Sequence, residues 1–222
     1  MDTLLKSINN QFLTFLGNAA FPCVAAKSAS QKGNIEIMIA DHLGCPKDDA
    51  DILRFIYAFT KTYRASAESF HSAAVIFTGP GQITEALFDR LMWQRLASLR
   101  SLDAVEYNYD SRVSADPASA DFSFSLMEEA FFIIGLHPQS SRPARRFQYP
   151  VLIFNPHAQF EAMKTDRRYG NMKAIVRKRD LAYSGSVNPM LTDFGESSEA
   201  YQYSGRRYET DAECPFTFNN NQ

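Results

Sequence analysis

Two histidines and a cluster of arginines stand close together in the second half of the chain. His137 follows an apolar run at residues 131–136, and His157 follows another at residues 151–154. The loop between them carries three arginines, Arg142, Arg145 and Arg146. Imidazole groups ligate metals and carry protons near neutral pH, and guanidinium groups bind carboxylate or phosphate oxygens two at a time. This order indicates a binding site for an anion, or else a solvated cationic loop between two core strands.

The elements that must position these residues can be read from apolar periodicity. Intervals of three and four predict helices, and short apolar or alternating runs predict strands. Helices are expected at residues 1–16, 48–65, 84–102, from 159 onward and at 171–180. Strands are expected at residues 35–39, 73–77, 121–125, 131–136 and 151–154. We expect an irregular link before residue 35 and no regular element after residue 184. This predicts an α+β fold, a mostly antiparallel sheet with helices packed against it.

The length and the net charge of the chain limit the class of protein it can be. A chain of 222 residues with 45% hydrophobic residues is long enough for one sizeable core, so we expect a single domain over residues 1–222. The net charge of −2 gives no electrostatic reason to expect nucleic acid or an anionic membrane as a partner. No run reaches the ~18 apolar residues of a membrane helix, and residues 1–17 are too polar for a signal peptide. We therefore expect a soluble, cytoplasmic protein.

The cysteines argue against two common kinds of site. The chain has three of them, Cys23, Cys45 and Cys214, with no C-x-x-C pair. An odd number without that spacing disfavours a disulfide framework and a structural zinc site. We expect free thiols.

Several segments resemble the YqcI/YcgG family. They include GLHP, SRPARRF and VLIFN in the central stretch, FPCVAAKSA at residues 21–29 and VSADPASADFSFS at residues 113–125. Towards the C-terminus they include GSVNPMLTDFGESSEAYQYSGR at residues 185–206 and CPF at residues 214–216. The resemblance covers nearly the whole chain. Because characterised relatives are haem-dependent N-oxygenases, it implies haem b as cofactor, O₂ and an external electron donor as partners, and a small amine or guanidine as substrate.

The resemblance makes the two histidines candidate ligands of the haem iron. They should lie at opposite ends of a hairpin whose strands span about 17–20 Å, too far apart to serve one iron. We place His137 first because the arginines follow it closely, and His157 second. Cys23 is the rival, because a thiolate donates electron density that helps to cleave the O–O bond. A small buried thiol beside Phe21 and Pro22 is the alternative for Cys23.

Roles for the charged residues also follow from the resemblance. Arg142, Arg145 and Arg146 would hold the haem propionates. A cationic substrate needs an acid to position it, and the acids of the DFGESSEA segment are Asp193, Glu196 and Glu199. We take Asp193 and Glu199 as the residues that bind substrate, the alternative being acids that are solvated or paired with Arg206 or Arg207.

Three classes of function stay open at this stage. The first is a haem-dependent N-oxygenase, the second a haem-binding sensor or carrier without turnover, and the third a cofactor-free protein whose arginine loop binds an anionic metabolite. A haem pocket and a phosphate pocket both use arginines beside aromatic residues, so the sequence does not distinguish the three classes. A homodimer is compatible with the sequence.

Overall fold

The structure is a computed structural model that describes residues 2–67, 70–165, 168–186 and 195–208. Its α-helices are α1 (Asp2–Gly17), α2 (Val24–Lys32), α3 (Asp49–Ala65), α4 (Glu85–Asp103), α5 (Ala158–Thr165), α6 (Arg168–Ser184) and α7 (Ala200–Tyr203). Its strands are β1 (Ile35–His42), β2 (Ser72–Gly79), β3 (Phe124–Leu126), β4 (Glu129–Leu136) and β5 (Val151–Pro156). Two short 3₁₀ turns, η1 (Pro46–Asp48) and η2 (Pro143–Arg145), complete the regular elements.

The strands form one sheet in the order β1-β2-β5-β4-β3. The pair β1 and β2 is parallel, with α3 in the connection between the two strands, and the other three pairs are antiparallel. The register of β4 and β5 sets Leu136 opposite Val151 and Phe131 opposite Pro156. His137 and His157 therefore leave the hairpin at opposite ends, as its predicted geometry requires.

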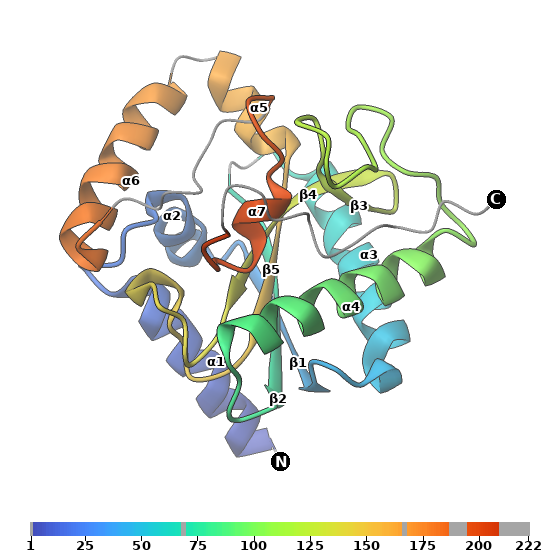
Figure 1. The fold of residues 1–222 in the computed structure, drawn as a ribbon, viewed down its shortest axis with the longest axis horizontal. Helices are drawn as coiled ribbons and strands as arrows, with labels where there is room; N and C mark the ends of the chain where they lie inside the picture. The colour runs from blue at the N-terminus through green and yellow to red at the C-terminus, as the bar shows by residue number, and fades with distance from the viewer. Residues whose placement is uncertain (1, 68–69, 166–167, 187–194, 209–222) are drawn as a thin grey trace.

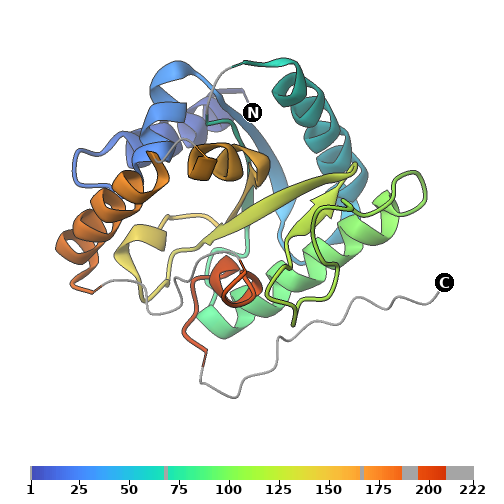
Figure 2. The same ribbon diagram turned by 90° about the horizontal axis from the view of Figure 1, so that it is seen from above.

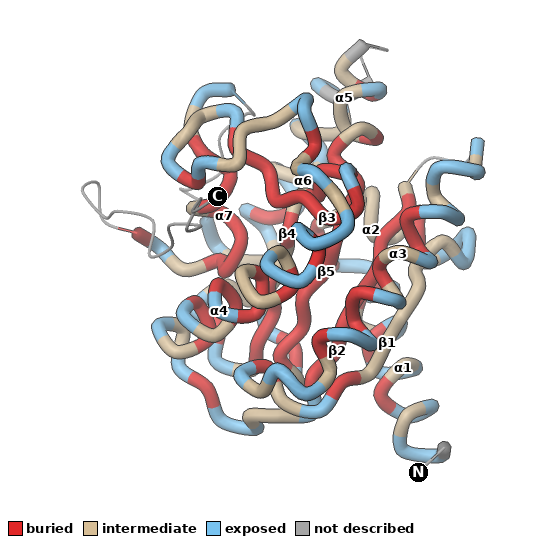
Figure 3. Tube along the Cα trace, turned by 90° about the vertical axis from the view of Figure 1, so that its right-hand side faces the viewer, coloured by how far each residue is buried: buried red, intermediate tan, exposed pale blue. Residues whose placement is uncertain are grey.

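The central strands are buried on both faces, so alternate side chains enter two different cores. On β5, Leu152 and Phe154 belong to one core and Val151 and Ile153 to the other. The first core is completed by α3 and α4, and the second by α1 and the segment around Phe21. Figures 1 and 2 show the sheet between these two groups of helices, with α6 on the same side as α1 and α2. In Figure 3 strands β2 to β5 are almost continuously buried, whereas the edge strand β1 is mostly half-buried.

Gly135 lets α4 approach the sheet closely. A Cβ at this position would lie 2.6 Å from Cε1 of Phe88, which α4 packs against β4, and 3.1 Å from the carbonyl oxygen of Tyr203. A real side chain cannot occupy that space, so glycine is needed for the contact rather than for its backbone freedom.

The predicted α+β class and the mostly antiparallel sheet are confirmed. The predicted positions of α1, α3, α4 and the strands agree with the structure to within a few residues. Two α-helices and both 3₁₀ turns were missed. The segment expected to be an irregular link contains α2, whose Ala- and Ser-rich sequence gives little apolar periodicity, and the tail contains the single turn α7. Among the described residues, no helix is long and apolar enough to cross a membrane.

Candidate functional site

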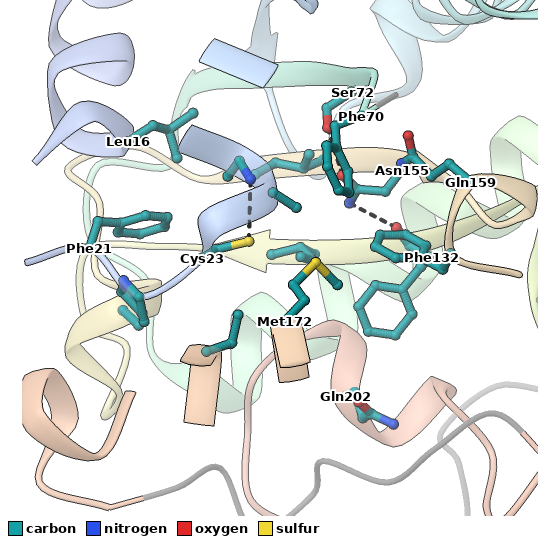
Figure 4. Close-up of a pocket in the computed structure, with 18 of the residues that line it drawn as sticks. Leu16, Phe21, Cys23, Phe70, Ser72, Phe132, Asn155, Gln159, Met172 and Gln202 are labelled. Carbon is teal, nitrogen blue, oxygen red and sulfur yellow. Dashed lines mark hydrogen bonds between the residues drawn. The ribbon is translucent and has the colours of Figure 1, made fainter. Parts of the chain in front are cut away.

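A cavity of about 290 Å³ lies between the sheet and the helices of the α6 side (Figure 4). Its floor is formed by the side chains that β4 and β5 direct to this face, such as Phe132, Ile134 and Ile153. Its other walls come from α1, the α1–α2 link, η2, α5, α6 and the turn that leads into α7. Small-molecule pockets usually measure ~300–1,000 Å³ and are mostly apolar with a few polar groups. The cavity lies at the lower end of that range and has the same character.

Cys23 enters the cavity at the N-terminus of a helix. It is the N-cap of α2, and its Sγ accepts a hydrogen bond of 3.4 Å from the backbone N–H of Ala26. Figure 4 shows the side chain of Cys23 among the cavity residues. Burial raises the pKa of the thiol, whereas the Ala26 N–H and the positive charge of Arg145 lower it. A helix N-terminus stabilises negative charge, so the surroundings of Cys23 can support a thiolate once a cation or metal binds it.

The three arginines of the central loop have different surroundings. Arg142 lines the cavity and donates to Asp180 Oδ2 of α6 at 2.6 Å. Arg145 also lines the cavity and donates to the carbonyl oxygens of Gly135, Gln202 and Tyr203 at 2.9–3.1 Å. Arg146 is exposed and does not line this cavity. The structure thus brings two of the three predicted anion-binding arginines to the cavity.

Arg145 carries a positive charge that no described carboxylate neutralises by direct contact. Its guanidinium group donates to backbone carbonyls of β4 and α7. Burial, and then the nearby charge of Arg142, lower the pKa of Arg145 to about 10. An anion in the cavity would compensate this charge, so the Arg145 end of the cavity favours anionic groups.

His157 and Glu199 meet at another part of the same cavity. Both side chains line it and are buried, and His157 Nε2 lies 3.8 Å from Glu199 Oε2. The other oxygen of Glu199, Oε1, accepts hydrogen bonds from Ser123 Oγ at 2.7 Å and Tyr203 Oη at 2.6 Å. Burial raises the pKa of Glu199 to about 8, and burial also lowers the pKa of His157. The two groups together therefore suit the binding of a cation or the exchange of a proton.

The cationic and acidic groups are separated along the sheet. Arg145 contacts the carbonyl of Gly135 on β4, whereas His157 follows the residue of β5 that pairs with Phe131. Gly135 and Phe131 are four residues apart, which corresponds to about 13 Å along a strand. A molecule that spans the cavity can present an anion to one end and a cation to the other.

His137 lies outside this cavity, on the opposite face of the sheet. Its ring stacks on Phe88 of α4 with centroids 4.5 Å apart, and the residue is only 1% exposed. Neither ring nitrogen has a hydrogen-bond partner among the described residues, and burial lowers the pKa of His137 to about 4. The reason is strand alternation, because Ile134 and Leu136 face the cavity and His137 is one residue out of phase. This geometry does not support our preference for His137 as the iron ligand over His157 and Cys23.

The cavity also contains polar residues that the sequence did not single out. Asn155 accepts from Ser72 Oγ at 2.7 Å and donates to the carbonyl of Phe132 at 3.1 Å. Gln159 accepts a hydrogen bond from the backbone N–H of His71 and donates one to its carbonyl oxygen. The preceding residue, Phe70, lines the cavity and has a positive φ of 66°. The sequence could have predicted Asn155, because it lies two residues after Ile153 on β5 and therefore faces the same side of the sheet. No sequence pattern indicated Gln159. Asp193 lies outside the described residues, and Glu196 is exposed.

The residues of the cavity fit a haem group in their chemistry. Haem iron needs an axial ligand such as a thiolate or imidazole, propionates need cations, and the macrocycle needs apolar walls. The cavity offers Cys23 and His157, then Arg142 and Arg145, and several aromatic and aliphatic side chains. Within the part of the chain that the structure describes, no three His, Cys, Asp or Glu residues cluster to hold a bare metal ion.

The raised pKa of Glu199 predicts a pH effect on stability. The folded state holds a proton on this carboxyl up to about pH 8, whereas the ordinary value is 4.5, so stability falls as pH rises between these values. Glu199→Gln should remove this loss, which is on the order of 2–3 kcal/mol between about pH 5.5 and 8. Denaturant unfolding of both proteins across that range tests it. Glu161→Gln, at a more exposed carboxyl, should retain the wild-type slope, and an unchanged slope in Glu199→Gln would contradict the prediction.

Comparisons with known proteins agree with the resemblance seen in the sequence. A protein of Bacillus subtilis (strain 168), "Uncharacterized protein YqcI", is 26% identical over 206 residues, which cover 88% of this chain and 80% of that protein. No solved structure matches the chain. The model of the YqcI/YcgG family matches residues 12–217, which include every described residue of the cavity. The chain therefore belongs to the YqcI/YcgG family.

Proposed function

We propose that the protein is a haem-dependent N-oxygenase that acts on an amine or guanidine nitrogen of a small molecule. The observation that carries the proposal is one apolar cavity that joins a thiol at a helix N-terminus, two arginines and a buried acid beside a histidine. These are the groups that haem ligation, propionate binding and substrate positioning require. The proposal includes haem b, O₂, an external electron donor and a cytoplasmic location.

Cys23 is the iron ligand in this proposal. It lies near Arg145, whose charge lowers the pKa of the thiol, and the N-terminus of α2 also favours the thiolate. Iron itself deprotonates a coordinating thiol, which would overcome the effect of burial. A thiolate ligand also favours O–O cleavage. His157 then stays available beside Glu199. The propionates are assigned to Arg142 and Arg145, and Arg146 is left out because it is exposed.

Haem bound in this cavity would supply the reductive activation of O₂. The protein must keep the lone pair of the substrate nitrogen free, because a protonated amine is not a nucleophile. Glu199 holds a proton up to about pH 8 in the empty cavity, and binding of a substrate cation would favour release of that proton to solvent. The resulting carboxylate, whose Oε2 faces His157 while Ser123 and Tyr203 hold Oε1, is then positioned to take a proton from the substrate nitrogen. The apolar walls around the cavity exclude water, which strengthens these electrostatic interactions.

A haem-binding sensor or carrier is the second candidate. The features of the cavity that suit haem would suit a sensor or carrier as well as an enzyme. Only the pair of Glu199 and His157 favours turnover. The third candidate, a cofactor-free binder of an anionic metabolite, draws support from the charge of Arg145, which no described carboxylate contacts. Haem content separates the third candidate from the others, and substrate consumption separates the first two.

The choice of ligand predicts a ranking among single variants. Cys23→Ala should abolish the thiolate signature in the absorption and electron paramagnetic resonance spectra of the haem-loaded protein, because it removes the donor atom. Cys45→Ala, at a thiol outside the cavity, should leave both spectra unchanged. His137→Ala should also leave them unchanged. Loss of the native spectrum in His157→Ala, with an intact one in Cys23→Ala, would move the ligand to His157.

The assignment of Glu199 predicts a separable effect on turnover. Reduced haem-loaded protein with O₂ and a suitable amine or guanidine should give a product one oxygen heavier, with that oxygen on nitrogen. Glu199→Gln should lower kcat/KM by about 100-fold, equivalent to about 2.7 kcal/mol, and should leave haem content unchanged. Glu106→Gln, at an exposed carboxyl outside the cavity, is the matched control. Mass spectrometry under ¹⁸O₂ with basic amino acids, cyclic guanidines and aminoazoles provides the assay, and label found only on carbon would contradict N-oxygenation.

A further inference from the structure

The outer face of α6 differs in charge from the rest of the protein. Residues 170–184 carry four cations and one acid, although the whole chain has a net charge of −2. The acid is Asp180, which lines the cavity and pairs with Arg142 at 2.6 Å. The only acid of this part of the helix therefore points inward, and no acid of the described residues pairs with the exposed cations of the outward face.

Exposed residues of α6 combine these cations with apolar groups. Lys178 and Arg179 are exposed and form no ion pair with any described residue. Ile175 and Leu181, which are 47% and 52% exposed, flank them along the helix. We call this set the α6 outer face: Ala174, Ile175, Lys178, Arg179, Leu181 and Ala182. Apolar contacts with a charged rim are typical of protein interfaces.

A third cation stands next to this face. Desolvation and the positive charge of Arg179 lower the pKa of Lys27 on α2, so the two groups repel one another. Lys27 satisfies one of its N–H donors with the carbonyl of Ala19 at 2.6 Å, not with an acid. A negatively charged partner would relieve this repulsion.

The α6 outer face is also the surface behind one wall of the cavity. Met172, Lys173 and Val176 line the cavity from the inner side of the same helix. A helix with its side chains is about 10–12 Å thick, so a partner on the outer face lies one helix away from the cavity. Figures 1 and 2 show α6 at the periphery of the molecule, where a partner can reach it.

We propose that the α6 outer face is the docking site of a small acidic electron-transfer protein, which delivers electrons to the cavity through α6. This inference rests on the proposed function, because only a redox cofactor in the cavity needs such a partner. An acidic protein suits the face better than a lipid surface, since its two flanking side chains are short aliphatic groups among cations. The face consists of six residues of one helix, which suits the small interfaces of transient redox complexes.

The test uses a plant-type [2Fe–2S] ferredoxin as the acidic probe. Binding is measured by calorimetry at about 10 mM and about 150 mM salt, where the Debye length is about 30 and 8 Å. Wild-type protein should bind, and binding should weaken with salt. Lys178→Glu/Arg179→Glu should weaken it by at least about tenfold. The control Lys61→Glu/Arg90→Glu makes the same change in net charge at exposed positions of α3 and α4 and should have little effect.

Several outcomes would overturn the inference. They are absence of binding at low salt, equal weakening in both double variants, and α6-dependent binding of phosphatidylserine vesicles or duplex DNA in place of the ferredoxin. Haem content is determined in the same samples, so failure of the proposed function shows as absence of haem and is distinguishable from failure of docking. In the haem-loaded protein, reduced ferredoxin should reduce the α6 variant more slowly than the control, whereas dithionite should reduce all proteins alike.

Discussion

Burial of β2, β5 and β4 on both faces is the constraint on which the rest of the structure depends. Each step of one residue moves a side chain from one core to the other. Ile153 and Asn155 therefore reach the cavity together with His157, while Phe154 packs below α4. The same rule sends His137 against Phe88. The chemistry available to the cavity is thus decided by strand phase, not by distance along the chain.

Arg145 joins the cavity to the opposite side of the fold. Its hydrogen bonds to the carbonyls of Gly135, Gln202 and Tyr203 tie η2 to β4 and α7. Tyr203 in turn stacks on Trp93 in the α4 core and donates to Glu199 at the cavity. The placement of the buried acid therefore depends on the same contacts that close the fold.

Much of the fold could be predicted from the sequence, and less of the site. Long periodic helices and apolar strands were visible, as was the hairpin that separates the two histidines. The strand phase was hidden because β4 and β5 are apolar on both faces, so the pattern of residues 131–136 gave no sign of which side His137 would take. The capping role of Cys23 could not be predicted, because α2 has too few apolar residues to show helical periodicity. Glu199 was named from the family resemblance, but its contact with His157 joins residues 42 positions apart in sequence.

Haem titration of the purified protein tests the central claim of this account most directly. The wild-type protein should take up one equivalent of haem with a saturable Soret band. Ala26→Trp, which places an indole ring in the cavity from α2, should lose this binding while its circular dichroism spectrum stays that of a folded protein. No stoichiometric haem uptake by the wild type, or unchanged uptake by Ala26→Trp, would contradict the assignment of the cavity as a haem site.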